Sequence, residues 1–411
     1  SVELCTTQSW KVSKNKMIPS SLSYIPGIYK IVDEVIVNAW DQFIRYKDQK
    51  NKVSNISISV SKETGIVTIE NDGNGVDILM HPEHNIYTVE MIFGKLLTST
   101  NYNENEERIT GGKNGYGAKL ANIFSKWFEI ETVDNVRKKH YKQTFKDNMN
   151  IREEPIIIPY SAKDNQFTKV SFLPDFERFG LTGWSDDMMS IFKRRAYEIS
   201  SCCGDRLKVN FNNEAVPVRR FREFCSMYYD EPNSIIYEST NPRWEVAVGL
   251  SDEFTQVSFV NGIYTMKGGK HVENITNMIC KKVSEIINKK EKINVKSSYI
   301  KEHLFLFINC IIVNPSFDSQ TKDYLTTQAS KFGSICKLSD NFYKDLVKHG
   351  LMERVLETYQ FKESKQIKKT DGKKKNRIYG IPKLDDANEA GGKRSSECTL
   401  IFTEGDSAKA M

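Results

Sequence analysis

The chain of 411 residues has a formal net charge of +6, with 39% hydrophobic and 27% charged residues, a composition typical of a soluble globular protein. It is long enough for two or three domains with separate cores. No apolar run reaches the roughly 18–20 residues that a membrane span needs, and no signal peptide is visible. The first residue is Ser1 rather than Met, so we expect a fragment of a longer protein.

The eight cysteines are scattered, and Cys202 and Cys203 form the only close pair. Neither a C-x-x-C motif nor a zinc-type Cys/His group occurs. His81 and His84 flank Pro82 without further ligands nearby, so we do not expect a metal there. The cysteines are interpreted as reduced thiols of an intracellular protein.

Positive charge is concentrated in two runs. Residues 361–377 carry a net charge of +6, equal to that of the whole chain, and residues 281–296 carry +4. Such clusters on an otherwise balanced chain favour a polyanion as partner. From composition alone, a solvated helix end and a flexible linker explain the two runs equally well.

Periodic apolar residues predict the elements of the first half of the chain. The expected helices cover residues 27–45, 86–100, 117–127 and 184–200. The expected strands cover residues 56–60, 66–69, 127–133, 140–146, 168–173 and 207–211. A long polar, glycine-rich loop is expected over residues 101–119.

A break near residues 230–233 starts a second pattern. The expected strands there cover residues 244–250, 255–264 and 303–313, and the expected helices cover residues 271–289, 319–331 and 339–358. Residues 361–395 are rich in Lys, Gly and Asp and are interpreted as a linker. A new strand is expected over residues 398–402.

Three polar residues share one face of the first predicted helix. Glu34, Asn38 and Asp41 stand at positions i, i+4 and i+7. Trp40 and Ile36 lie outside the main apolar stripe, so the helix is expected to be buried on most sides. A buried polar row needs a partner, which favours a functional row over a solvated polar face.

Two glycine-rich stretches follow that helix. The sequence N-D-G-N-G at residues 71–75 allows positive φ and close approach to a ligand, although an ordinary type I′-like turn explains it equally well. Residues 110–119 hold four glycines and two lysines and run into a predicted helix, which favours an anion site. Neither the P-loop pattern nor the dinucleotide fingerprint occurs.

The order of these three features resembles the Bergerat nucleotide-binding fold of gyrase B, heat-shock chaperones, histidine kinases and MutL. Further strings narrow the resemblance to the eukaryotic type IIA DNA topoisomerases. They are P-G-I-Y-K-I (26–31), I-F-G (92–94), L-L-T-S (96–99), G-G-K-N-G-Y-G-A-K (111–119), N-P (314–315), S-Q-T-K (319–322) and E-G-D-S-A (404–408). The resemblance covers essentially the whole chain, with the strings in the right order.

The resemblance implies an α/β fold of the α+β sandwich type with four segments. We expect a Bergerat-fold (GHKL) ATPase domain over residues 1–230 and a transducer domain, similar to domain 2 of ribosomal protein S5, over residues 231–360. A basic linker is expected over residues 361–395, and the truncated start of a Toprim domain over residues 396–411.

The resemblance also assigns roles to single residues. Glu34 is the expected general base that activates the water attacking ATP, and Asn38 is expected to hold Mg²⁺. Asn71 is expected to meet the adenine amino group. The expected contacts to ribose and phosphates are Ser99, Thr100, Asn101, Gly112, Lys113, Asn114, Gly115, Tyr116, Gly117, Ala118 and Lys119.

Two further segments receive roles in the same way. In the second domain, Gln320 and Lys322 are expected to reach the γ-phosphate, with Thr321 between them in the same binding segment. Lys322 is thereby expected to take part in catalysis. Glu404 is expected to be the first acidic residue of an incomplete Toprim Mg²⁺ site.

The implied activity is that of a nuclear topoisomerase with no membrane association. ATP binding is expected to close a gate between two copies of the chain, and hydrolysis to drive one DNA duplex through a break made in another. Lys289, Lys290 and Lys292 are expected to contact double-stranded DNA. Because the Toprim aspartates and the nucleophilic-tyrosine domain are missing, we expect no DNA cleavage. No N-terminal arm precedes Ser1, so we expect weakened dimerisation.

Three other interpretations fit the sequence less well. Another Bergerat ATPase, such as a MutL-like mismatch-repair protein or a chaperone, lacks the E-G-D-S-A and S-Q-T-K strings. A non-hydrolysing ATP-binding module has no need of a base such as Glu34. A structural nucleic-acid-binding protein would explain the lysine runs but not the Glu/Asn row.

Overall fold

The structure is a computed structural model that describes residues 2–49, 52–82, 84–95, 109–110, 117–160, 166–231, 233–370, 387 and 389–402. For residues 364–370 it describes the backbone alone. The chain divides into two units, residues 1–351 and 352–411, which are described separately.

The first unit begins with a two-stranded antiparallel hairpin that the sequence analysis did not predict. Its strands are β1 (Cys5–Ser13) and β2 (Lys16–Tyr24), joined by a turn in which Lys14 and Asn15 have φ of 47° and 58°. The hairpin packs against helix α4 (Asp186–Ser201). It was missed because few of its residues are strongly apolar and most are only partly buried.

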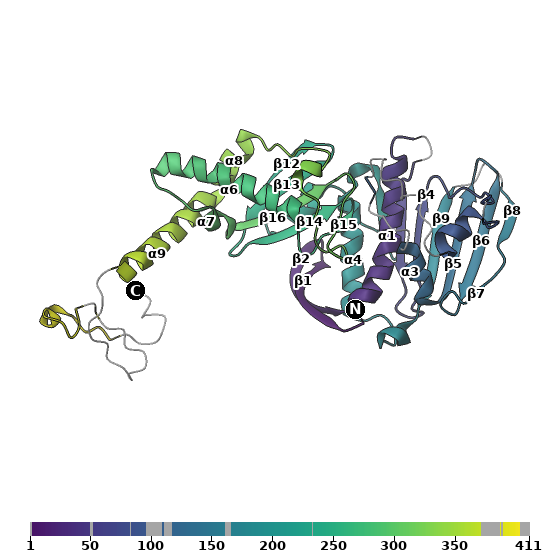
Figure 1. The fold of residues 1–411 in the computed structure, drawn as a ribbon, viewed down its shortest axis with the longest axis horizontal. Coiled ribbons are helices and arrows are strands. Elements are labelled where there is room, and N and C mark those ends of the chain that lie inside the picture. The colour runs from purple at the N-terminus through teal and green to yellow at the C-terminus, as the bar shows by residue number, and fades with distance from the viewer. Residues whose placement is uncertain are drawn as a thin grey trace. The chain divides into compact units, whose positions relative to one another are not determined.

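A nine-stranded sheet forms the centre of the first half of the chain (Figure 1). Its strands are β3 (Asn55–Val60), β4 (Val67–Asp72), β5 (Ser125–Asp134), β6 (Lys139–Lys146), β7 (Ile151–Arg152), β8 (Ile156–Pro159), β9 (Phe167–Pro174), β10 (Lys208–Phe211) and β11 (Glu214–Ala215). The spatial order is β11-β10-β3-β4-β9-β5-β6-β7, and β8 also pairs with β6. Strands β10 and β3 are parallel, and the other neighbours are antiparallel.

Helices α1 (Pro26–Tyr46), α3 (Gly117–Ile123) and α4 pack against this sheet. Helix α1 follows the predicted bounds, and it is buried on most of its surface because apolar residues surround nearly the whole helix. In β3, Ile56, Ile58 and Val60 alternate with partly exposed residues and are buried, as expected for a strand with one face on the core. The shorter helix α2 (Thr88–Gly94) lies within the predicted range 86–100.

A five-stranded sheet follows in the chain. Its strands are β12 (Ile235–Asn241), β13 (Trp244–Leu250), β14 (Thr255–Val260), β15 (Ile263–Tyr264) and β16 (Leu304–Cys310), in the order β12-β13-β16-β14-β15. Strands β14 and β16 are parallel, and α6 (Lys270–Glu291) lies between them in the chain. The remaining short helices of this unit are α5 (Phe221–Ser226), α7 (Ser297–Lys301) and α8 (Asp340–Leu346).

Two predicted elements of the first unit end early or divide. The helix predicted over 117–127 ends at Ile123, because Trp127 and its neighbours pair with β6 and β9 as strand β5. The strand predicted over 255–264 is a hairpin, since Asn261 and Gly262 turn the chain with φ of 50° and 72°.

The helix predicted over 319–331 is wrong. Residues there form an irregular loop with bridges from Leu325 to Phe317 and Gly269, and the helical part is a single 3₁₀ turn at Ala329–Lys331. The hydroxyl of Thr321 bonds with the side chains of Ser319 and Asp323. Such local side-chain bonds offer the backbone an alternative to the helix.

The C-terminal predictions also need correction. The helix predicted over 339–358 is interrupted by a π-turn at Val347–Leu351, where Gly350 has φ of 98°. Helix α9 (Met352–Thr370), in the second unit, includes the first ten residues of the predicted linker. Residues 398–402 are not a strand, and no strand of the described residues pairs with them. Within the described ranges, none of the helices has the length and apolarity that crossing a membrane requires.

Candidate active site

The carboxylate of Glu34 lies at the centre of a buried group of charges. Glu34 projects from α1 and is 3% exposed. Lys322, from the loop after β16, donates from its Nζ to Glu34 Oε1 at 2.8 Å, although 288 residues separate the two in sequence. Lys30, one turn before Glu34, places its Nζ 3.2 Å from the same oxygen. The carboxylate is therefore shared between two ammonium groups.

These cations decide the protonation state of Glu34. Burial alone would raise its pKa, but the ammonium groups of Lys322 and Lys30 outweigh burial and hold the pKa of Glu34 below its usual value. Glu34 is thus a carboxylate at neutral pH. It is able to accept a proton once a cation moves away from it.

A second carboxylate, Asp33, extends the charged group towards α4. Lys30 Nζ lies 3.0 Å from Asp33 Oδ2, and Arg195 Nε donates to Asp33 Oδ1 at 2.6 Å. Burial would raise the pKa of Asp33, yet the guanidinium of Arg195 and the ammonium of Lys30 hold it far below its usual range. Lys30, Asp33 and Arg195 were not predicted as site residues. The available signal was the presence of charged residues beside apolar ones on the two helices.

Helix α3 closes one side of Glu34. A Cβ atom on Gly117 would lie 2.6 Å from Glu34 Oε2, so any other residue there would require the Glu34 carboxylate or α3 to shift. Ala118 and Lys119 follow on the same helix and are buried, Lys119 at 1% exposure. Burial lowers the pKa of Lys119 to about 8. The three residues Gly117, Ala118 and Lys119 thus lie at the start of a helix packed against α1.

Asn71 lies near the end of β4 and is buried. Its amide nitrogen donates to the carbonyl of Asp72 at 2.9 Å. The Asp72 carboxylate accepts from the backbone N–H groups of Ser54 and Asn55, and a Cβ atom on Gly75 would lie 2.0 Å from the carbonyl of Val133. The N-D-G-N-G stretch is therefore fixed between β3 and β5.

The other members of the predicted site are placed differently. Asn38 is partly exposed one turn after Glu34, and Asp41 is buried one turn further on. In the loop after β16, Gln320 is exposed, Thr321 is partly exposed, and Lys322 is buried with φ of 61°. With Lys322 in the left-handed region, its side chain is buried, while those of the two preceding residues remain at least partly exposed. The structure thus brings Lys322 to Glu34 but leaves Gln320 on the surface.

Several predicted residues lie outside the described residues. They are Ser99, Thr100, Asn101, Gly112, Lys113, Asn114, Gly115, Tyr116 and Glu404. In the described ranges, no group of three or more His, Cys, Asp or Glu side chains is close enough to hold a metal ion.

The predicted DNA-binding lysines lie far along the chain from this site. Lys289 and Lys290 are exposed in the last turn of α6, and Lys292 is the exposed left-handed residue that ends the helix. Cations at a helix C-terminus are favourable because of the helix dipole. Their position therefore has a structural reason as well as the predicted functional one.

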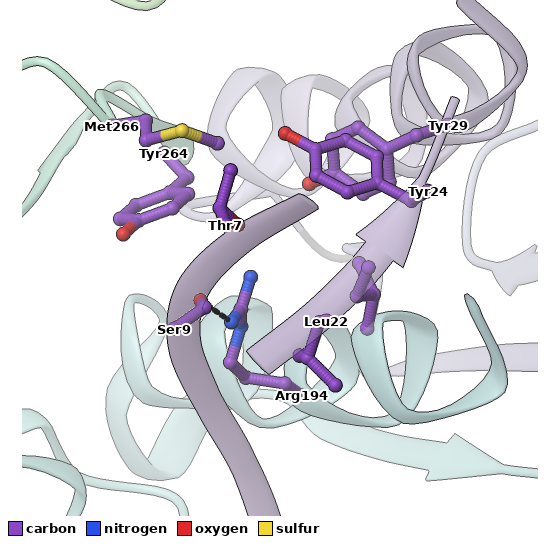
Figure 2. A pocket seen from close by; sticks show the side chains of 9 residues that line it. Thr7, Ser9, Leu22, Tyr24, Tyr29, Arg194, Tyr264 and Met266 are labelled. Atoms are coloured by element: carbon purple, nitrogen blue, oxygen red, sulfur yellow. Dashed lines mark hydrogen bonds between the residues drawn. The ribbon is translucent and has the colours of Figure 1, made fainter. Parts of the chain in front are cut away.

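A separate pocket lies where the N-terminal hairpin meets α4 and β15 (Figure 2). Arg194 of α4 points into it and donates to the hydroxyl of Ser9 at 2.5 Å and to the carbonyl of Trp10 at 2.8 Å. Tyr24, Tyr29 and Tyr264 supply aromatic walls. Arg194 thus connects β1 to α4.

Comparison with known proteins first defines the class. Residues 217–375 match the model of the DNA gyrase B family. The matched segment contains the five-stranded sheet and the loop that supplies Lys322, so this part of the chain is similar to DNA gyrase B.

Closer relatives define the family. The chain is 44% identical over its whole length to DNA topoisomerase 2 of Arabidopsis thaliana, of which it spans 28%. It is similar to the ATPase region of Saccharomyces cerevisiae topoisomerase II, with 41% identity, a TM-score of 0.83, and coverage of 88% of this chain and 93% of that one. For the ATPase and transducer domains of Balamuthia mandrillaris topoisomerase II, the identity is 39%, the TM-score 0.84, and the coverage 89% and 93%.

The chain belongs to the eukaryotic DNA topoisomerase II family and corresponds to its ATPase region. The predicted fold class, an α/β Bergerat ATPase fold, is confirmed by the structural match. The MutL-like alternative is not supported.

Proposed function

We propose that this chain binds ATP next to α1 and hydrolyses it, with Glu34 as general base. The contact between Lys322 and Glu34 carries this proposal. It joins a helix on the nine-stranded sheet to a loop that follows the five-stranded sheet, at 2.8 Å and with both side chains buried. A surface ion pair contributes little to stability, and a buried pair has a desolvation cost, so function is the better reason for it.

The charges suggest how hydrolysis is controlled. Glu34 in contact with both Lys322 and Lys30 is a weak base, because its charge is neutralised. The γ-phosphate of ATP carries more negative charge than one carboxylate, so Lys322 is expected to leave Glu34 for the phosphate. Glu34 then regains basicity and accepts a proton from the attacking water, while Lys322 neutralises charge on the transferred group.

The residues present fit a nucleotide-borne Mg²⁺ ion. Mg²⁺ commonly takes one or two protein oxygens and completes its octahedron with phosphates and waters. Asn38 lies one turn from Glu34 on α1 and is partly exposed, so its amide oxygen is able to serve as such a ligand. Bound there, the ion would supply charge neutralisation of the phosphates. Asn71 is proposed to bind adenine, and Gly117, Ala118 and Lys119 the phosphates.

We propose the same domain division as the sequence suggests. The nine-stranded sheet uses residues 55–215 and the five-stranded sheet residues 235–310, which supports an ATPase domain over 1–230 and a transducer domain over 231–360. The Balamuthia structure is described as containing two domains of these names. The residues from 361 onwards are proposed to be a linker and the start of a Toprim domain.

The chain spans about 28% of its Arabidopsis relative, so the activity of the whole protein is also a proposal. The relatives are named DNA topoisomerases. We infer that ATP joins two copies of this chain into a gate, that hydrolysis drives passage of one DNA duplex through another, and that the protein acts in the nucleus.

Replacing the base tests the proposed function. Glu34→Gln keeps the shape of the side chain but is unable to accept the proton, so turnover of ATP is expected to fall about 10²–10⁴-fold. Binding of an ATP analogue is expected to remain. Glu63→Gln, the same change on the exposed turn between β3 and β4, serves as control and is expected to keep full turnover. Near-normal turnover of purified Glu34→Gln would place the base elsewhere.

Sedimentation tests the proposed gate. The chain is expected to be a monomer with ADP and to form dimers with a non-hydrolysable ATP analogue. Because association depends on concentration, the measurement covers a range of protein concentrations. A monomer at every concentration with the analogue would contradict dimerisation of this chain.

A further inference from the structure

A row of buried charges connects Glu34 with helix α4 and with the second sheet. From Glu34 it passes through Lys30 and Asp33 to Arg195 at distances of 3.2, 3.0 and 2.6 Å. Arg195 is completely buried. Its remaining nitrogens reach the carbonyl of Gly262 at 2.6 Å and the carboxylate of Glu198 at 3.5 Å.

Gly262 lies in the turn between β14 and β15 of the five-stranded sheet. With φ of 72° it is in the left-handed region, and a Cβ atom there would lie 2.6 Å from the ring of Trp40 on α1. The turn is thus held on one side by α1 and on the other by Arg195. One guanidinium therefore binds both the helix that carries Glu34 and the sheet whose following loop supplies Lys322.

Within this row of charges, Lys30 is the residue whose position depends on Arg195. It lies almost equally far from Asp33 and Glu34, at 3.0 and 3.2 Å. Arg195 satisfies the other oxygen of Asp33. Without Arg195, Asp33 would have Lys30 as its one remaining close cation among these groups, and Lys30 would be drawn away from Glu34.

We propose that Arg195 is a positioning residue for ATP hydrolysis: by neutralising Asp33 it keeps Lys30 on Glu34, whereas its bond to Gly262 contributes to the stability of the fold. This inference rests on the proposed role of Glu34. Arg195 does not pair with Glu34 itself, since two residues, Asp33 and Lys30, stand between them in the row. Its loss is therefore expected to change the rate of the chemical step more than the binding of ATP.

Three variants of Arg195 distinguish neutralisation of Asp33 from a purely structural role of the side chain. Arg195→Met removes the cation, and kcat is expected to fall about ten- to a hundredfold through misplacement of Glu34, with KM for ATP within about twofold of the unmodified protein. The double variant Arg195→Met with Asp33→Asn removes both charges, so Lys30 stays with Glu34 and most of kcat is expected to return. Arg195→Lys keeps a cation near Asp33 and is expected to retain most of kcat.

Arg194→Met is the matched control. Arg194 is the neighbouring arginine on α4, is also buried, and pairs with the same Glu198 at 3.0 Å, but it contacts Ser9 and Trp10 instead of Asp33. Its replacement is expected to lower thermal stability while leaving kcat per folded molecule unchanged. All rates are divided by the folded fraction, measured by circular dichroism.

The inference is overturned if Arg195→Met keeps full kcat per folded molecule, or if the double variant is as slow as Arg195→Met. If Arg195→Met does not fold, the other two variants decide: both must stay within about threefold of the unmodified kcat, and a larger loss in either contradicts the proposal. Glu34→Gln is measured alongside. Full turnover in Glu34→Gln would instead refute the assignment of the base.

Discussion

The lysines near Glu34 and the lysines at the end of α6 lie in two different environments. Lys30 and Lys322 are buried and held within 3.2 Å of a carboxylate. Lys289, Lys290 and Lys292 are exposed at a helix end. Buried charges interact strongly and only in one geometry, whereas exposed charges are screened by salt and act mainly as a group.

The difference teaches where a single substitution is informative. In the buried cluster each charge has a defined partner, so a change to one residue alters the protonation or position of the next. At the end of α6 a single lysine is expected to matter little, and a role in binding appears only when several are removed together.

Among these lysines, the largest expected effect is that of Lys322→Ala. ATP turnover is expected to fall at least about tenfold, because charge on the transferred phosphoryl group loses its lysine. Affinity for ADP is expected to stay within about twofold, since ADP lacks the contacted group. Kinetics and titration with labelled nucleotides measure the two quantities. Lys331→Ala, on an exposed residue of the same loop, is the control.

Equal losses of affinity for ADP and an ATP analogue, with turnover intact, would contradict that prediction. Lys322 would then be a binding residue without a part in hydrolysis.

A buried neutral histidine, His271, is expected to have an intermediate effect, on the pH dependence of the free energy of unfolding. His271, in the first turn of α6, is fully buried, and its Nε2 lies 3.2 Å from the hydroxyl of Thr265. Burial lowers its pKa to about 3, against a small opposing influence of Glu273. In the unfolded chain His271 binds a proton below about pH 6.5, so its contribution to stability is complete above that pH and is lost as the pH falls.

The free energy of unfolding is therefore expected to drop by about 2 kcal/mol between pH 7 and pH 5 through His271 alone. His271→Gln is expected to be less stable at pH 7 but to show a flatter pH dependence in urea unfolding. His84→Gln, at an exposed position, is expected to leave the slope unchanged. An unchanged slope in His271→Gln would mean that His271 is not the responsible group.

The smallest effect on stability is expected at the end of α6. Replacing Lys289, Lys290 and Lys292 together by Ala is expected to change the free energy of unfolding by less than about 1 kcal/mol. Binding of duplex DNA is expected to weaken, and the slope of log K against log salt to fall by up to about 0.9 for each lost phosphate contact. Fluorescence anisotropy of labelled duplex DNA at several salt concentrations measures the affinity and its salt dependence.

A triple alanine variant at Lys337, Lys344 and Lys348 removes the same charge from other exposed positions of the same unit. If both triple variants flatten the slope equally, the lysines of α6 act through net charge alone. If neither does, they form an ordinary solvated face.

The sequence allowed much of the buried site to be predicted, because its residues follow simple patterns. Glu34 and Asn38 stand out as polar positions on an apolar helix, and the string containing Lys322 marked that lysine as a residue of the nucleotide site, although its contact with Glu34 was not predicted. Arg195 could not be predicted in the same way. Periodicity shows that a residue lies on a helix, but not that its side chain crosses to Asp33 on another helix.

The errors in the fold have a similar origin. Trp127 lies in both a predicted helix and a predicted strand, and pairing of β5 with β6 and β9 makes it a strand residue. The loop around Thr321 looked helical because its hydroxyl and carboxylate bonds are invisible to periodicity. The N-terminal hairpin is stabilised by its packing against α4 rather than by its own apolar pattern.

Gly117 determines how closely α3 packs against the proposed general base, Glu34. Its missing side chain lets α3 rest directly on Glu34, and a methyl group there would come within 2.6 Å of Oε2. A larger residue at position 117 would therefore require the Glu34 carboxylate or α3 to move, so this one position couples the packing of α3 to the placement of the proposed base.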